Sequence, residues 1–149
     1  MSETELRLLE LLKERSFKRA PEGQPFILAS GEKSEYFIDC KMTAVNSTGA
    51  ELIGEVLYDH TKNDKIDGIG GLQVGAVPLV TAAAISYAKH GRTLEGFWAR
   101  EEVKSHGTQK QIEGGLKKGM RVAVIDDVFT RGGSTLKQQF PTVDISLKM

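Results

Sequence analysis

Two adjacent carboxylates, Asp126 and Asp127, directly follow an apolar run at positions 122–125. The residues after them, Val128 to Ser134, combine hydroxyl side chains with paired glycines in the order VFTRGGS. Carboxylates accept hydrogen bonds from the vicinal hydroxyls of a sugar. Glycines let backbone N–H groups approach a phosphate, and a helix N-terminus favours an anion. The segment therefore predicts a sugar-phosphate site at the end of a strand.

Two other interpretations of this segment explain less of its pattern. A buried strand with a solvated acidic turn and an N-cap serine accounts for the acids and for Ser134, but not for all the positions together. A strand that ends in two acids also holds magnesium in P-loop NTPases. The chain contains no GxxxxGK[ST] sequence, which excludes that alternative.

The elements that must position this site alternate between strand and helix. Strands are expected at 66–70, 93–100 and 122–126, and an alanine-rich helix is expected to begin at Pro78 and to be closed by Gly91. Strands that alternate with helices pair in parallel through crossover connections. The pattern predicts an α/β fold with an open sheet, in which ligands bind beyond the carboxyl ends of the strands.

The N-terminal region is predicted to form a helix and a hairpin. Ser2 and Glu5 have the spacing of a capping box, and the leucines after them predict an amphipathic helix over residues 2–15. Strand-like runs at 26–30 and 35–40 are expected to pair around the turn between them.

A second helix is expected after this hairpin. Thr48 and Glu51 have capping-box spacing, and the apolar positions that follow predict a helix over about 47–62.

Composition limits the class of protein. The 149 residues suit one domain, and 20 acidic residues balance 20 basic ones, so that no overall charge favours nucleic acid or a membrane surface as partner. Cys40 is the only cysteine, which excludes an internal disulfide. No apolar run reaches the ~18 residues of a membrane span, and the N-terminus lacks the pattern of a signal peptide. We expect a soluble, cytoplasmic protein.

Several motifs together resemble those of one enzyme family. Segment 122–134 resembles the phosphoribosyl diphosphate signature of type I phosphoribosyltransferases. Residues 26–39, FILASGEKSEYFID, are similar to the F-x-L-x-S-G-x-x-S-x-Y-x-x-D region of orotate phosphoribosyltransferases. GGLQVGAVPL at 70–79 resembles the pyrophosphate loop of that family. The residues Arg100, Lys104, His106 and Gly107 match its R-K-x-x-K-x-H-G loop.

This resemblance implies the fold and the reaction. The fold is an open, mostly parallel sheet flanked by helices, in a single domain over 1–149. Within it, 1–45 would be a hood-like N-terminal region, 46–137 the core and 138–149 a divergent tail. The reaction is transfer of ribose 5-phosphate from phosphoribosyl diphosphate to orotate, giving orotidine 5′-monophosphate and diphosphate in pyrimidine (UMP) biosynthesis.

The resemblance also assigns roles to individual residues. The acids would hold the ribose hydroxyls, and the loop after them the 5′-phosphate, with Thr130 also near orotate. Arg100 would meet the pyrophosphate, and Phe37 would stack on orotate. The substrate-binding residues so implied are Phe37, Arg100, Lys104, His106, Asp126, Asp127, Val128, Phe129, Thr130, Arg131, Gly132, Gly133 and Ser134. Lys104, His106 and Asp127 are the catalytic residues among them.

The partners implied are small molecules and a second copy of the chain. Mg²⁺ would arrive with the diphosphate substrate rather than on protein ligands. Segment 101–115 is polar and glycine-flanked, and in this family such a segment forms a lid that reaches into the neighbouring subunit's site. A homodimer is therefore expected, with neither nucleic acid nor a membrane as partner.

The C-terminal end departs from the family pattern. After Lys137 the family continues with a further helix and strand, whereas this sequence ends in QQFPTVDISLKM. We therefore expect a C-terminally truncated chain whose sheet lacks its last strand or strands. Two alternatives to an active enzyme follow from this ending. One is a regulator that binds phosphoribosyl diphosphate, and the other is an inactive truncated homologue.

Glu101 is a second departure, because it stands where the family motif usually has lysine. A carboxylate near the expected phosphate oxygens has the wrong sign for binding. We expect Glu101→Lys to raise the apparent affinity for phosphoribosyl diphosphate in a steady-state assay. An unchanged or weaker affinity would show that Glu101 does not face the diphosphate.

Overall fold

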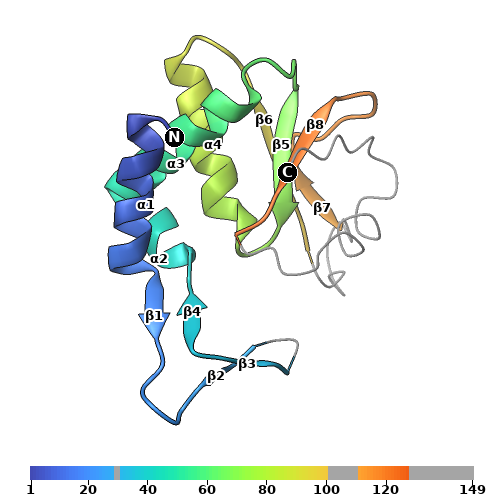
Figure 1. Ribbon diagram of the computed structural model, residues 1–149. Coiled ribbons are helices and arrows are strands. Elements are labelled where there is room, and N and C mark those ends of the chain that lie inside the picture. Colours follow the sequence, from blue (N-terminus) through green and yellow to red (C-terminus); the bar gives the residue numbers. More distant parts are fainter. Residues whose placement is uncertain (29–30, 101–110, 128–149) are drawn as a thin grey trace.

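The computed structural model describes residues 1–28, 31–100 and 111–127, and these residues form a four-stranded sheet covered by helices (Figure 1). The strand order is β7-β6-β5-β8. Strand β5 (Gly68–Leu72) pairs in parallel with both β6 (Glu95–Ala99) and β8 (Val122–Ile125). Strand β7 (Ile112–Gly114) pairs antiparallel with β6. The predicted α/β fold with a mostly parallel sheet is confirmed.

Strand β7 was not predicted from the sequence. It lies inside segment 101–115, for which we expected a lid, so that residues 112–114 belong to the sheet instead. Residues 112–114 form a strand because they pair with Phe97–Ala99, and not because of a pattern in their own sequence. Residues 101–110 lie outside the described part of the chain.

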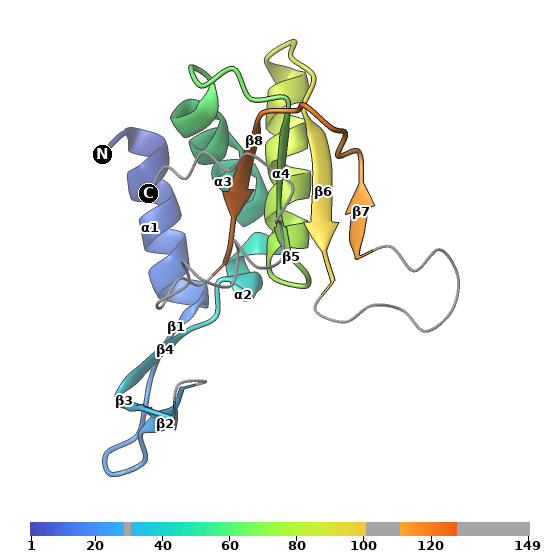
Figure 2. The same cartoon turned by 90° about the vertical axis from the view of Figure 1, so that its right-hand side faces the viewer.

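In the described part of the chain, the helices lie on one face of the sheet (Figures 1 and 2). Helix α4 (Ala76–Lys89) packs on the sheet, and α3 (Ser47–Thr61) packs on α4. Helix α1 (Glu3–Arg15) packs mainly against α3. A short helix, α2 (Lys41–Ala44), which was not predicted, lies between α1 and α3.

The helix ends agree in part with the predicted signals. The capping box of Ser2 and Glu5 is confirmed at the start of α1. Helix α3 covers nearly the predicted range, but its capping box at Thr48 is wrong. Asn46, in an extended conformation two positions earlier, caps α3 by accepting a hydrogen bond from the Gly49 N–H.

Helix α4 ends at the predicted glycine. Gly91 has a φ of 69°, in the left-handed region that favours glycine. Beyond it, the Arg92 N–H donates to the Tyr87 carbonyl at 2.9 Å, which satisfies one of the last helical carbonyls. Helix α4 begins at Ala76, so that Pro78 lies inside its first turn rather than at its first position.

The N-terminal arm, residues 17–28 and 31–38, extends away from the sheet (Figure 2). Its strands pair differently from our expectation. Strand β4 (Tyr36–Ile38) pairs with β1 (Phe17–Arg19), and β2 (Phe26–Ile27) pairs with β3 (Lys33–Ser34). The single hairpin predicted for 26–30 and 35–40 is therefore wrong. The pairing of β1 with β4 follows from the position of β1 at the end of α1, which the local pattern does not encode.

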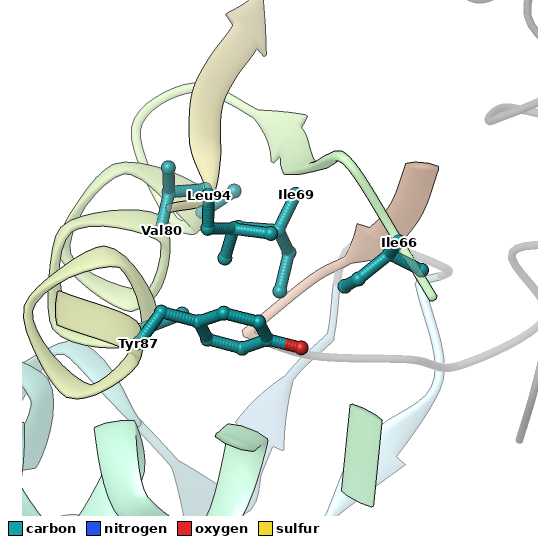
Figure 3. Packing of buried hydrophobic residues seen from close by; sticks show 7 residues of the cluster. Ile66, Ile69, Val80, Tyr87 and Leu94 are labelled. Carbon is teal, nitrogen blue, oxygen red and sulfur yellow. The ribbon is translucent and has the colours of Figure 1, made fainter. Parts of the chain in front are cut away.

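One cluster of buried hydrophobic residues lies between the sheet and α4 (Figure 3). Tyr87 is fully buried there together with Ile69, and Ile66, Val80 and Leu94 complete the labelled cluster. The Tyr87 hydroxyl lies 2.8 Å from the Thr61 hydroxyl of α3, so that this buried polar group has a partner. No helix in residues 1–28, 31–100 and 111–127 has the length and apolar character to cross a bilayer.

The hydroxyl of Tyr87 gives a test of this core. We expect Tyr87→Phe to lower the free energy of unfolding by about 1 kcal/mol in urea denaturation, because a buried hydrogen bond is lost while the ring packing stays. Tyr36→Phe is the matched control, since Tyr36 is exposed. Equal stability of the two variants would contradict the assigned hydrogen bond.

Candidate substrate-binding site

The site forms where β5 and β8 end. Gly71 of β5 lies opposite Ile125 of β8, so that the loop after β5 and the acids after β8 leave the sheet at the same edge. Gly75, just before α4, passes so close to Asp127 that a Cβ added to Gly75 would collide with the carboxylate. The glycine segment and the paired acids, which the sequence placed in separate motifs, thus form one surface.

Asp126 and Asp127 adopt unequal roles in this surface. The Asp127 N–H donates to Oδ1 of Asp126 at 2.9 Å, which turns the Asp126 carboxylate back toward the chain. Burial raises the pKa of Asp126 above its usual value, and the neighbouring Asp127 carboxylate raises it further.

Lys41 is a third member of the site that our sequence analysis missed. Its Nζ donates to Oδ2 of Asp127 at 2.9 Å and lies 3.3 Å from Oδ1 of Asp39. The bond to Asp127, and then the contact with Asp39, raise the pKa of Lys41, so that the ammonium is held in its charged form. The acid-x-lysine spacing after strand 36–38 is visible in the sequence, but nothing local connects it to residue 127.

Asp39, Asp126, Asp127 and Lys41 form a cluster whose buried side is acidic. Oδ1 of Asp39 is buried and has no aligned hydrogen-bond donor, although it is within ion-pair distance of Lys41. Burial, and next the Asp127 carboxylate, raise the pKa of the Cys40 thiol, which keeps the thiol protonated. Three carboxylates face one lysine here. Such a surface suits a ligand that donates hydrogen bonds, as sugar hydroxyls do, better than it suits a phosphate.

Two predicted site residues lie in other surroundings. Arg100 follows β6, and its guanidinium bonds to Glu113 of β7 at 3.1 Å. Phe37 lies in β4, 40% exposed, with its ring 5.6 Å from that of Phe26. Within the residues that the structure describes, neither side chain bonds to the paired acids. Their predicted contacts with pyrophosphate and orotate stay predictions.

The remaining predicted site residues lie outside the described residues. They belong to the segments 101–110 and 128–149, and their roles also stay predictions. They are Lys104, His106, Val128, Phe129, Thr130, Arg131, Gly132, Gly133 and Ser134.

Comparison with known proteins gives relatives of one kind. No protein-family profile matches the chain. An orotate phosphoribosyltransferase of Sorangium cellulosum is 40% identical over 134 residues, which cover 88% of this chain and 68% of the relative. That of Aquifex aeolicus is 41% identical over 131 residues, covering 88% of this chain and 71% of the relative.

Solved structures agree with these relatives. The orotate phosphoribosyltransferase of Mycobacterium tuberculosis, in complex with Fe(III) dicitrate, matches with a TM-score of 0.76 at 28% identity, over 95% of this chain and 79% of the other. The same enzyme in complex with 5-phospho-α-D-ribosyl 1-diphosphate matches with a TM-score of 0.72 at 26% identity, over 95% and 78%. The paired acids beside a glycine segment, the type I phosphoribosyltransferase fold and these identities lead to one conclusion: the chain belongs to the orotate phosphoribosyltransferase family.

Proposed function

We propose that this chain transfers ribose 5-phosphate from phosphoribosyl diphosphate to orotate, giving orotidine 5′-monophosphate and diphosphate for pyrimidine biosynthesis. The observation that carries the proposal is the position of Asp127 at the end of β8, directly beside Gly75 of the loop after β5. In this arrangement the carboxylate oxygens of Asp127 can accept hydrogen bonds from a diol. The glycine backbone at residue 75 leaves room for the substrate group that lies next to the diol. Family membership supplies the identity of the two substrates.

The reaction makes one bond and breaks one. N1 of orotate bonds to C1 of the ribose, and the bond from C1 to the diphosphate oxygen breaks, so that diphosphate leaves with the electron pair. Positive charge develops on the ribose ring as that bond lengthens. Fixed carboxylates that hold the ribose hydroxyls orient the ring and lie near this charge, which is the kind of preorganised electrostatic help that lowers a barrier.

The leaving diphosphate needs cations, and we propose that Mg²⁺ arrives bound to it. In the described residues, no group of three or more His, Cys, Asp or Glu side chains has the arrangement of a metal site. The oxygens of the diphosphate substrate would hold the ion, as the resemblance implies, and the ion would stabilise the charge of the leaving group. Lys104, His106 and Arg100 would add positive charge there, as the resemblance implies.

We also propose that the protein is a cytoplasmic homodimer. Each chain would form a single domain with a hood-like N-terminal region at 1–45, a core at 46–137 and a divergent tail at 138–149. The single cysteine supports a reducing compartment. The homodimer is supported by the resemblance of loop 100–107 to one that completes the neighbouring subunit's site.

The test is turnover of orotate by the purified chain. With phosphoribosyl diphosphate and Mg²⁺ present, chromatography should show orotidine 5′-monophosphate, and Asp127→Asn should lower kcat/KM by about 100-fold, because an amide replaces a charged acceptor. Asp59→Asn is the control, since Asp59 lies in an exposed ion pair with Lys62. Binding of phosphoribosyl diphosphate without turnover would favour a regulator, and no binding would favour an inactive homologue.

Gly75→Ala tests the contact at the base of the site. The added methyl group would collide with the Asp127 carboxylate and displace it, so that we expect the KM for phosphoribosyl diphosphate to rise about tenfold or more. Gly91→Ala is the control. The alanine would strain the backbone at the C-terminal end of α4, away from the site, because the φ of Gly91 is 69°. It should lower stability and leave KM unchanged. A normal KM in Gly75→Ala would argue against this site.

A further inference from the structure

We propose that Lys41 is a positioning residue for phosphoribosyl diphosphate, which acts by holding the Asp127 carboxylate in the orientation that receives the ribose hydroxyls. This inference rests on the proposed function, since it assumes that Asp127 binds the diol. It adds a residue from α2, an element that lies outside all the motifs by which the family was recognised.

The Asp127 carboxylate is held from two sides. Its Oδ1 lies against the backbone of Gly75, at the place where a Cβ would collide with it. Its Oδ2 accepts the hydrogen bond from Nζ of Lys41 at 2.9 Å. Rotation of the carboxylate in one direction is blocked by the chain at residue 75, and in the other direction it would break the bond to Lys41. The orientation is therefore fixed by Gly75 and Lys41 together.

The backbone that carries Lys41 is firmly anchored. Thr43 and Ala44 of α2 are buried, and the Thr43 hydroxyl lies 2.6 Å from the hydroxyl of Ser16, also buried. Helix α2 packs against both α1 and α3. Figures 1 and 2 show α2 near the end of the sheet at which β5 and β8 stop. The ammonium group thus extends from a fixed base to the site.

Lys41 also balances charge where an anionic substrate must enter. Asp39, Asp126 and Asp127 lie around it, and Lys41 is the cation that pairs with two of them in the described residues. Without Lys41, Asp127 would face Asp126 and Asp39 with no cationic partner among those residues. Repulsion from the neighbouring acids would then turn the carboxylate toward solvent, which would remove an acceptor for the diol.

The side chain keeps capacity for a bound substrate. Lys41 is 47% exposed at its side chain, whereas the Asp127 side chain is 12% exposed. An ammonium group has three donors, of which the hydrogen bond to Asp127 uses one. Lys41 therefore keeps hold of Asp127 while its open side faces the solvent from which the substrate arrives.

The experiment measures phosphoribosyl diphosphate binding by calorimetry with Mg²⁺. We expect Lys41→Met to raise Kd about tenfold or more, and Lys41→Gln to raise it similarly because the charge is lost. Lys41→Arg should stay within about threefold of the wild type, because it keeps a cationic donor. Lys89→Met is the matched control. Lys89 is 50% exposed and bonds to Glu51 at 3.0 Å between two helices.

Each outcome decides the proposal. A tenfold loss in Lys41→Met, rescue in Lys41→Arg and unchanged binding in Lys89→Met support it, as does a KM for orotate that stays at the wild-type value. Equal Kd values in Lys41→Met and the control overturn it while leaving the proposed function intact. If Lys41→Met does not fold, Lys41→Gln and Lys41→Arg give the same comparison. Wild-type protein that binds no phosphoribosyl diphosphate overturns both this inference and the proposed function.

Discussion

The register between β5 and β8 determines where the site forms. Gly71 lies opposite Ile125, so that the chain leaves both strands at one level and Gly75 then passes directly beside Asp127. A shift of that register would move Asp127 away from the backbone that supports it, and would also break its bond to Lys41. The parallel pairing of two short strands is thus the constraint on which the acids, the glycine segment and the lysine all depend.

Charge explains why the site requires several segments. Within the described residues, the site brings together three carboxylates and one lysine, a balance that favours hydroxyl donors over phosphate groups. Cations for a diphosphate must come from other segments, and Arg100, the predicted candidate within the described residues, is held by Glu113 at the edge of the sheet. Binding of the diphosphate would have to compete with that ion pair, which is partly exposed and therefore weak.

The features that the sequence predicts well are those with local causes. The apolar run before Asp126 and the glycine after α4 were found because their signals lie within a few residues of the structure they produce. The cap of α3 shows the limit of such signals. Asn46 and Thr48 are both capping residue types, and only the extended backbone at Asn46 selects it.

The contacts that the sequence does not predict join distant segments. Lys41 reaches Asp127 only because α2 is held against α3 on one side of the sheet while β8 ends beside β5. Lysine is a suitable residue for this place, because it pairs with a carboxylate through one point charge and leaves the remaining acceptor directions free. Incomplete neutralisation of the acids is therefore what allows them to bind a sugar.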